Sequence, residues 1–426
     1  MSHLTRRGLL IGGAGVAAVA LQPEIAHATA PTSTHSVRFT LNATVLDGGE
    51  QVTSLTLDTS DFGMIDPASL TTSTFKVHAK ATNPIPVAPG DLVLTEYDLD
   101  RVVTGARIEH DKIILDLATT DQVTGGGTLA YLVNEGRNVL MTLVYTITQT
   151  APLTLRNHAS LTLPGFTQGK LADPEVDAYS YHKSKDGMNY RLFSPAGAER
   201  WTGRSKRPLI VWLHGGGEGG LLSANYYDNE PTLRANRGAL GFSTPEAQRV
   251  FDGAYVVAPQ AESYWLENGP KYSPRVRAII LDLVRRYPID PSRIYLAGCS
   301  NGGYLTMLMT SMYHDIFAAA VPICGVVRNF PKAPAINITD DQLKSITTPS
   351  WLVCAKSDTT VPPIDNSEPA SKLIPGAIFT EFDTVTRNGI TYPGHWSWIY
   401  VARNDPQYHG QHIWQWMASK RLSGRR

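Results

Sequence analysis

The chain has 426 residues, of which 42% are hydrophobic and 18% charged, a composition typical of a globular protein with more than one domain. Lys plus Arg and Asp plus Glu both number 38, so the formal net charge at pH 7 is zero. This balance argues against a nucleic-acid-binding protein and against a polybasic membrane anchor.

Residues 1–28 have the pattern of a twin-arginine export signal. Arg6 and Arg7 precede an apolar run from Gly8 to Leu21 that is too short to span a bilayer comfortably. Ala26-His27-Ala28 supplies the small residues that a signal peptidase requires. Since no later apolar stretch is long enough for a membrane span, we expect a secreted, extracellular protein.

Residues 36–150 are predicted to form an all-β, immunoglobulin-like sandwich. Val37, Phe39, Leu41, Ala43 and Val45 alternate with polar residues, the period of a half-buried strand. Further short runs follow at Ser54–Leu57, Thr74–His78, Leu92–Tyr97, Lys112–Leu117 and Val139–Thr148. Short strands separated by glycine-containing turns are typical of such sandwiches. If the chain forms a homo-oligomer, we expect this domain to provide the contact.

Residues 151–170 are predicted to be a linker, and residues 171–426 a second domain. Asp177–His182 and Met188–Phe193 flank Asp186-Gly187, which indicates a hairpin. Apolar runs follow at Pro208–Leu213, Ala254–Ala258, Ile294–Ala297, Ala318–Ile323, Trp351–Ala355 and Ala377–Phe382. Short buried strands that alternate with amphipathic helices predict a mostly parallel sheet with helices on both faces.

Three stretches between and after these strands are predicted to be helices. Pro274–Tyr287 carries apolar residues on one face, with Ser273 as its cap and Pro274 in the first helical position. A second helix is expected to start near Ser243, where Glu246 completes a capping-box pattern. The last covers about His412–Leu422.

The strongest chemical feature is Gly298-Cys299-Ser300-Asn301-Gly302-Gly303, between the strand Ile294–Ala297 and a helix. A serine hydroxyl becomes a useful nucleophile when a base removes its proton and a sharp turn exposes it. Glycines two residues before and after Ser300 let such a turn form without steric clashes. Ser300 is therefore the predicted nucleophile of an acyl-transfer enzyme.

The second feature is His214-Gly215-Gly216-Gly217, at the end of the strand Pro208–Leu213. Acyl transfer passes through an oxyanion, which backbone N–H groups can stabilise. We expect one donor from Asn301 and the other from Gly216, with Gly217 next in line. His214 belongs to the strand end and is expected to be structural.

A base and an orienting acid should follow the nucleophile in the order Ser, Asp, His. Asp358 lies just beyond the strand Trp351–Ala355, and His395 lies in a loop after the strand Ala377–Phe382. Loops at the carboxyl ends of parallel strands face one crevice, so Asp358 and His395 are predicted to join Ser300. The alternatives are Asp365 or Asp383 for the acid and His409 or His412 for the base.

Several further side chains are expected near this crevice. Glu218 follows the glycine run and either orders that loop or touches the substrate. The aromatic residues that could line a substrate pocket are Tyr264, Trp265, Tyr304, Trp396 and Trp398. We take Glu218, Trp265, Tyr304 and Trp396 as the candidate substrate-binding residues.

The chain has three cysteines, Cys299, Cys324 and Cys354, all at or near the ends of apolar runs. An odd, small count does not indicate a disulfide framework, and buried free thiols are the expected state. A bridge between Cys324 and Cys354 is the alternative.

Residues 205–400 resemble the secreted esterases and "predicted peptidases" related to polyhydroxybutyrate depolymerases and feruloyl esterases. The matching segments are Trp212–Glu218, Val257–Gln260, the serine motif with Gly303, Phe317–Gly325, Asp358 with Val361-Pro362, and Gly394–Trp398. Several members of this group carry an N-terminal immunoglobulin-like domain. This chain departs from many of them in having Cys299 and, where they have methionine, Asn301.

The resemblance implies an α/β-hydrolase fold, a Ser300–Asp358–His395 triad and ester hydrolysis that needs neither a metal ion nor another cofactor. We therefore expect a secreted carboxylesterase that acts on a small-molecule or polymeric ester. The alternatives are a polyester depolymerase or a serine peptidase with the same triad, and a non-catalytic binding protein.

Overall fold

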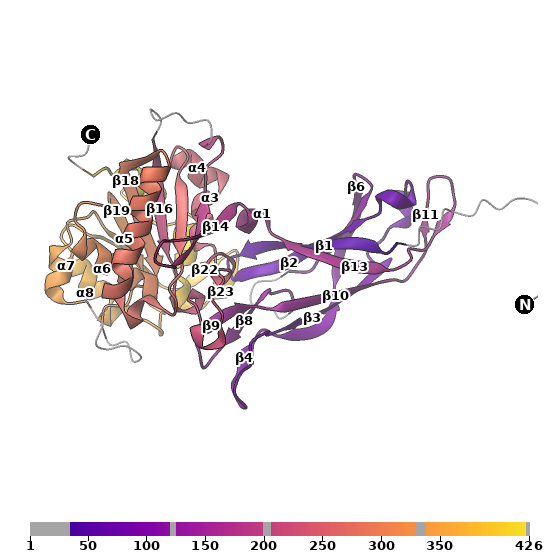
Figure 1. Cartoon of the computed structure of the whole chain (residues 1–426), viewed down its shortest axis with the longest axis horizontal. Helices are drawn as coiled ribbons and strands as arrows, with labels where there is room; N and C mark the ends of the chain where they lie inside the picture. Colours follow the sequence, from indigo (N-terminus) through magenta and orange to yellow (C-terminus); the bar gives the residue numbers. More distant parts are fainter. Residues whose placement is uncertain (1–34, 120–124, 199–205, 329–337, 423–426) are drawn as a thin grey trace, which may run out of the picture.

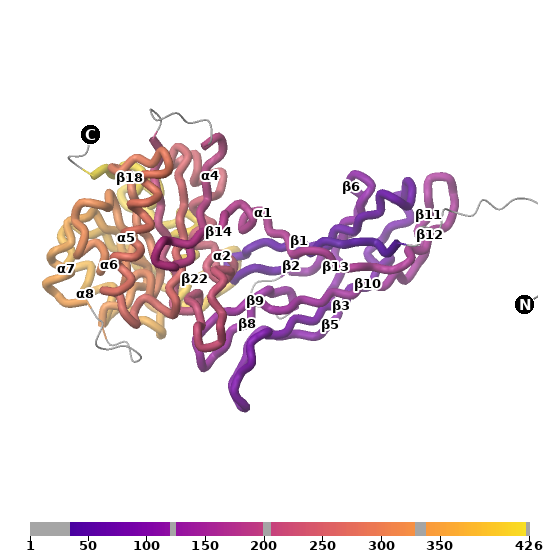
Figure 2. Tube along the Cα trace, viewed as in Figure 1, coloured from indigo at the N-terminus to yellow at the C-terminus, as the bar shows by residue number. Residues whose placement is uncertain are grey.

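The computed structural model describes residues 35–119, 125–198, 206–328 and 338–422. Figures 1 and 2 show an elongated molecule in which an N-terminal β domain extends from a C-terminal domain of strands and helices. The predicted export signal, residues 1–28, lies outside the described residues. Within the described ranges, no helix is long and apolar enough to cross a membrane.

The β domain is built mainly from a five-stranded sheet in the order β13-β1-β2-β7-β6 and two three-stranded sheets, β10-β3-β5 and β4-β8-β9. Side chains from these sheets share one hydrophobic core that includes Phe39, Leu55, Val77, Leu115 and Tyr145. The strands are β1 (Val37–Leu46), β2 (Gly49–Asp58), β3 (Phe75–Thr82), β4 (Val93–Leu94), β5 (Tyr97–Arg101), β6 (Val103–Glu109), β7 (Lys112–Leu117), β8 (Leu129–Leu132), β9 (Arg137–Leu140), β10 (Thr142–Gln149), β11 (Leu153–Thr154), β12 (Ser160–Leu161) and β13 (Phe166–Ala172).

The predicted linker at residues 151–170 is wrong, because this segment is part of the β domain. It contains β11, β12 and most of β13, and β13 pairs in parallel with β1 from Val37↔Phe166 onward. Gly169 interrupts the apolar alternation of β13 and coincides with a register shift opposite Phe39, which hides the strand pattern in the sequence.

The C-terminal domain contains an eight-stranded sheet in the order β14-β15-β17-β16-β18-β19-β20-β21. The predicted hairpin is confirmed as β14–β15, which joins the sheet in antiparallel fashion, and the other strands pair in parallel. The strands are β14 (Tyr179–Lys183), β15 (Asn189–Phe193), β16 (Arg207–Leu213), β17 (Tyr255–Pro259), β18 (Ile289–Cys299), β19 (Ala319–Ile323), β20 (Trp351–Ala355) and β21 (Ile378–Phe382).

Helices cover both faces of this sheet, as predicted (Figure 1). Side chains along β16 alternate between two cores. Leu209 and Val211 belong to the core that includes side chains of α5–α8, and Ile210 and Trp212 belong to the core that includes side chains of α3, α4, α9 and α10. The helices are α1 (Pro174–Asp177), α2 (Pro231–Arg234), α3 (Gly238–Ser243), α4 (Pro245–Val250), α5 (Gly269–Arg286), α6 (Asn301–Met312), α7 (Asp340–Ser345), α8 (Ser367–Leu373), α9 (Trp398–Ala402) and α10 (Ile413–Ser419).

One predicted helix start is wrong by a few residues, and another is confirmed. Helix α5 is capped by Asn268, whose side chain accepts from the Lys271 N–H, so Ser273 and Pro274 lie inside the helix. Pro270 in the first turn already suits a helix start, since its nitrogen has no proton to satisfy there. Helix α4 starts near Ser243, as predicted, with Thr244 as its N-cap residue.

The two domains are joined by an interlocking interface. Val45, at the end of β1, is packed in the core of the C-terminal domain, and Leu221 is packed in the core of the β domain. Arg403 pairs with Asp47 at 2.7 Å across the junction. A second ion pair across it joins Arg234 to the buried Glu50. Such shared packing fixes the orientation of one domain relative to the other.

Asp173 gives this interface an expected pH dependence. Burial, and next the nearby Glu50 carboxylate, raise the pKa of Asp173 to about 7 in the folded protein, against about 3.9 in an unfolded chain. The contribution of this raised pKa to stability is therefore fully present below pH ~4 and is lost as the pH rises through ~7. Asp173→Asn keeps an oxygen to cap α1 but carries no charge. The variant should therefore melt a few degrees above the native protein at pH 8, with a smaller difference at pH 5.

Thermal unfolding at several pH values checks this prediction, with Asp66→Asn as the matched control. Asp66 also caps a short helix of the β domain, but its side chain lies at the surface. A difference in melting temperature between Asp173→Asn and the native protein that does not change with pH would contradict it.

Candidate active site

Ser300 occupies the turn between strand β18 and helix α6. It is the N-cap residue of α6, with a φ of 55° and a ψ of −113°. This backbone conformation costs a non-glycine residue about 1–3 kcal/mol. It persists only because the surrounding structure holds the turn in place. The Ser300 N–H donates to the Ile323 carbonyl at 2.8 Å, which anchors the turn to the end of β19.

Gly302 allows the start of α6 to lie directly against the end of β16. A Cβ at this position would lie 2.0 Å from the Leu213 carbonyl oxygen and 2.7 Å from that of His214. Any side chain would push the helix away from the strand. The glycine therefore brings the first turn of α6 next to the loop that follows β16.

That loop, Gly215–Glu218, is the predicted source of the oxyanion donors. A Cβ on Gly216 would lie 3.5 Å from Asn301 Nδ2, so Gly216 and Asn301 are neighbours. The Asn301 N–H is in the first turn of α6, where backbone donors have no partner within the helix and the helix dipole favours negative charge. Asn301 Oδ1 accepts from the Leu266 N–H at 2.8 Å, which fixes this side chain.

His214 has a structural position, as expected. Its ring is fully buried, with Nδ1 donating to the Gly215 carbonyl at 2.6 Å and Nε2 accepting from the Ala261 N–H at 3.0 Å. Burial lowers the pKa of His214 to about 3, so the ring stays neutral. This arrangement ties the glycine loop to the segment that follows β17.

Asp358 and His395 form a hydrogen-bonded pair, with His395 Nδ1 2.8 Å from Asp358 Oδ2. The other carboxylate oxygen of Asp358 accepts from the N–H groups of Thr360 and Val361, each at 2.9 Å. Asp358 is 2% exposed, so its orientation is fixed by these bonds. Because it accepts from Nδ1–H, the neutral ring keeps Nε2 available as a base.

Gly394 permits this approach, because a Cβ there would lie 2.3 Å from the Ser357 carbonyl. The loop that carries His395 can therefore pack directly against the loop that carries Asp358. No larger residue fits at position 394 without moving one of the two loops.

Cys324 lies close to both the serine turn and the histidine. It follows Ile323, which accepts from the Ser300 N–H, and it offers a sulfur within 4.8 Å of ligand atoms of Asp358 and His395. Burial lowers the pKa of His395, whereas Cys324 and then the bond to Asp358 raise it by more.

Cys324, Asp358 and His395 are also the one group in the described ranges with the donor atoms and spacing for a metal ion. Two of its three members already bond to each other through the atoms that a metal would need. All three cysteines of the chain are buried and free, so the structure has no Cys324–Cys354 bridge.

The alternative acids and bases lie elsewhere. Asp383 pairs with Lys356 at the surface, and Asp365 is in a short turn after Pro362. His412 caps α10 and bonds to the Asn404 carbonyl, while His409 packs on Tyr408. The structure thus brings Asp358, rather than these acids, to His395.

Two predicted substrate-binding aromatics are wrong, because they are buried. Trp265 is 0% exposed and donates through Nε1 to the His214 carbonyl, so its role is to hold the start of the glycine loop in place. Tyr304 is 1% exposed and packs beneath α5 beside Gly269. The sequence could not distinguish these positions, because an aromatic residue near the active-site loops looks the same whether its side chain faces the crevice or the core.

Trp396 and Glu218 differ from each other in position. Trp396 is half-buried, next to His395, with its ring 6.0 Å from that of Trp398. It remains a candidate for substrate contact.

Glu218 is buried, and its carboxylate lies near Asn236 Nδ2 at 3.5 Å, which favours the loop-ordering alternative. Burial raises the pKa of Glu218 to about 7.

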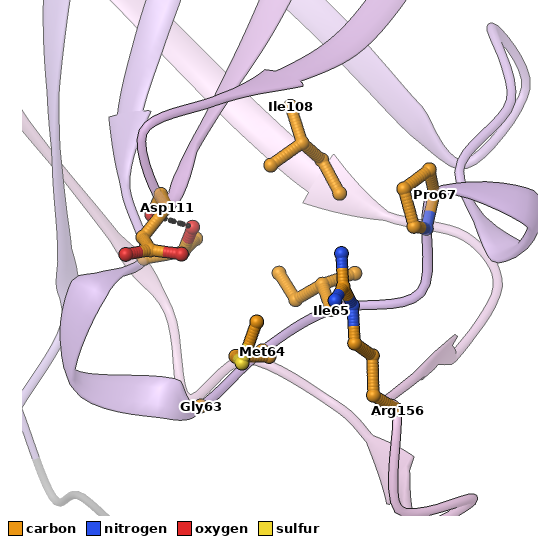
Figure 3. Close-up of a pocket in the computed structure, with 8 residues that line it drawn as sticks. Gly63, Met64, Ile65, Pro67, Ile108, Asp111 and Arg156 are labelled. Atoms are coloured by element: carbon orange, nitrogen blue, oxygen red, sulfur yellow. Dashed lines mark hydrogen bonds between the residues drawn. The ribbon is translucent and has the colours of Figure 1, made fainter.

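The β domain contains a separate cavity of about 140 Å³, whose lining residues Figure 3 shows. It lies near β11, and Thr59 donates to the Asp111 carbonyl at its edge. The lining residues are Thr59, Gly63, Met64, Ile65, Pro67, Ile108, Asp111 and Arg156. Without a nucleophile and base pair among them, the Ser300 region is the better candidate for catalysis.

Comparison with known proteins supports a hydrolase. The chain superposes on a crystal structure of a thermostable esterase with a TM-score of 0.71 and 25% identity, covering 90% of this chain and 99% of that one. The fold is that of an α/β-hydrolase. A family model described as the prolyl oligopeptidase family matches residues 276–336, which include Ser300.

Sequence relatives carry names of ester-cleaving enzymes. A poly(3-hydroxyalkanoate) depolymerase C from Paucimonas lemoignei is 33% identical over 84 residues, 17% of this chain and 20% of the relative. A probable acetylxylan esterase A from Aspergillus flavus is 29% identical over 119 residues, 26% of this chain and 38% of the relative. The chain thus spans only about a fifth to two fifths of the length of these relatives.

Proposed function

We propose that this protein is a carboxylic ester hydrolase that uses Ser300, His395 and Asp358. The observation that carries the proposal is the 2.8 Å bond between His395 Nδ1 and buried Asp358. Cys324 Sγ lies within 4.8 Å of this pair, and the residue before it, Ile323, accepts from the N–H of Ser300 at the strained strand-to-helix turn. A fixed acid–imidazole pair near a half-buried serine at such a turn is the arrangement that acyl transfer requires. The named relatives and the esterase fold support the same reaction class.

In the proposed mechanism, Ser300 Oγ attacks the ester carbonyl carbon while His395 Nε2 takes its proton. Asp358 keeps the ring in the correct tautomer and stabilises the imidazolium. The imidazolium then protonates the departing alcohol, which leaves an acyl-enzyme on Ser300. Water, deprotonated by His395, releases the carboxylic acid and restores the serine.

The negative oxygen of each tetrahedral intermediate would be bound by the N–H groups of Asn301 and Gly216, with Gly217 as the next donor. Their adjacent positions at the helix start and in the glycine loop support this assignment. Trp396, on the same turn as His395, is our proposed contact for the acyl or alcohol group of the substrate.

A polyester depolymerase is the second candidate, favoured by the similarity to the Paucimonas lemoignei enzyme. The match to the prolyl oligopeptidase family supports a serine peptidase in the same way. All three reactions use the same nucleophile and base, so the substrate separates them.

The test is a substrate series given to the native protein and to Ser300→Ala. We expect the native protein to cleave p-nitrophenyl esters, with a dependence on acyl length, and the variant to be inactive. Cleavage of poly(3-hydroxybutyrate) with poor turnover of short esters would favour the depolymerase. Release of p-nitroaniline from peptide anilides alone would favour the peptidase, and no reaction with any of them would contradict the proposal.

We also propose that the protein is exported and that its β domain is immunoglobulin-like. The twin-arginine pattern of residues 1–28 supports export. The neighbouring strands β1-β2-β7-β6 and β10-β3-β5 follow the A-B-E-D and F-C-C′ arrangement of immunoglobulin sheets in chain order, which supports the second proposal.

A further inference from the structure

The β8–β9 hairpin of the β domain lies against the glycine loop of the proposed oxyanion hole. Asn138 Nδ2 donates to the Gly217 carbonyl at 3.3 Å, and Arg137 Nε donates to the Gly220 carbonyl at 3.1 Å. Just beyond, the Leu140 N–H donates to Tyr226 Oη at 2.8 Å. Figures 1 and 2 show β8 and β9 at the end of the β domain that meets the hydrolase domain.

The contact at Gly217 is close enough to exclude a side chain. A Cβ on Gly217 would lie 2.8 Å from Asn138 Nδ2 and 3.8 Å from Tyr131 Cε2. Asn138 and Tyr131 come from β9 and β8. The hairpin therefore packs directly against the glycine loop at Gly217, next to the residue that neighbours Asn301.

Arg137 is itself held in place. It is 7% exposed, its Nη1 donates to the carbonyls of Glu135 and Gly136, and its guanidinium lies 5.1 Å from the centre of the Tyr264 ring. The Arg137 side chain is therefore held in one orientation where the hairpin contacts the loop.

The hydrolase domain fixes the same loop through anchors of its own. Gln260 Nε2 donates to the Glu218 carbonyl at 3.0 Å, and His214 ties the first glycine to Ala261. Between these anchors lies Gly217, whose carbonyl accepts from Asn138. Consecutive glycines lose more conformational freedom on ordering than other residues, so they depend on such external bonds.

We propose that Asn138 is a positioning residue for the oxyanion hole, so that the β domain is a structural part of the active site. Oxyanion donors stabilise the transition state only if they already point at the developing charge. Asn138 acts through the Gly217 backbone and touches no reacting atom. This inference rests on the proposed hydrolase function.

The test is Asn138→Ala in the full-length protein, with Asn42→Ala as the matched control. Asn42 is also a β-domain asparagine whose amide is hydrogen-bonded, to Ser54 and Thr56, but it lies on β1 away from the loop. We expect Asn138→Ala to lower kcat for p-nitrophenyl esters by roughly tenfold with little change in KM, since the lost bond orders groups used in the transition state. Asn42→Ala should keep the native kcat.

A second readout separates positioning from general stability. The inhibition constant of a boronic acid, which mimics the tetrahedral intermediate, should rise about as much as kcat/KM falls. The inhibition constant of the product carboxylate should stay unchanged. A loss of stability alone would lower the active fraction and leave both inhibition constants as they were.

Native kcat and boronic acid affinity in Asn138→Ala would overturn the inference, and so would equal losses in Asn138→Ala and Asn42→Ala. If the native protein neither hydrolyses esters nor reacts at Ser300 with a fluorophosphonate probe, the proposed function fails, and the inference with it. An active native enzyme beside an unaffected Asn138→Ala variant overturns the inference alone.

Discussion

Replacing Ser300 by alanine should lower kcat/KM for p-nitrophenyl esters by roughly a thousandfold or more, because no other group can form the acyl-enzyme. Steady-state kinetics and mass-spectrometric detection of fluorophosphonate labelling check this result. The label should appear on the peptide that contains Ser300 in the native protein and be absent in the variant.

Ser311→Ala is the matched control for this change. Ser311 is on the same helix, and its hydroxyl donates to the Leu308 carbonyl within that helix. We expect native activity from Ser311→Ala and a native melting temperature from both variants. Ester hydrolysis by Ser300→Ala within tenfold of the native rate would remove Ser300 from the mechanism.

Replacing Asp358 by asparagine should lower kcat by about a thousandfold to ten-thousandfold, since the amide no longer holds His395 in the tautomer that leaves Nε2 free. Asp383→Asn is the control, because Asp383 is the alternative acid and lies at the surface with Lys356. If Asp383→Asn is the damaging change and Asp358→Asn is mild, the acid of the proposed triad is wrong.

The pH profile gives a second measure of the Asp358–His395 pair. The base must be neutral, so activity rises as the pH passes the pKa of His395, and Cys324 and Asp358 raise this pKa above its ordinary value. Removing the Asp358 charge lowers it. The acid limb of the kcat/KM profile should therefore move to lower pH in Asp358→Asn and stay in place in Asp383→Asn.

Local sequence patterns were enough to predict the parts of the site that depend on short-range geometry. The strand-to-helix turn at Ser300 follows from glycines at fixed offsets, and the placement of Asp358 follows from the strand Trp351–Ala355 just before it. In the same way, the period-two pattern of β1 is visible in its alternating burial. Such features need only neighbouring residues to form.

Features that depend on distant packing were not predictable. The direction in which Trp265 faces is set by its bond to the His214 carbonyl, 51 residues away. The contact of Asn138 with Gly217 spans 79 residues and two domains, and no motif surrounds Asn138. Cys324 was detectable in part, since it stands at the end of a parallel strand, where residues converge on the crevice.

The exchange of Val45 and Leu221 between the two cores limits how this protein can be rearranged. A catalytic unit cut out at the domain boundary would leave a hole where Val45 was packed and an exposed Leu221. We therefore expect that exchanging the β domain for an unrelated one destabilises the protein, and that substitutions on one side of the junction constrain those on the other. For engineering, the two domains should therefore be expressed and modified together as one unit.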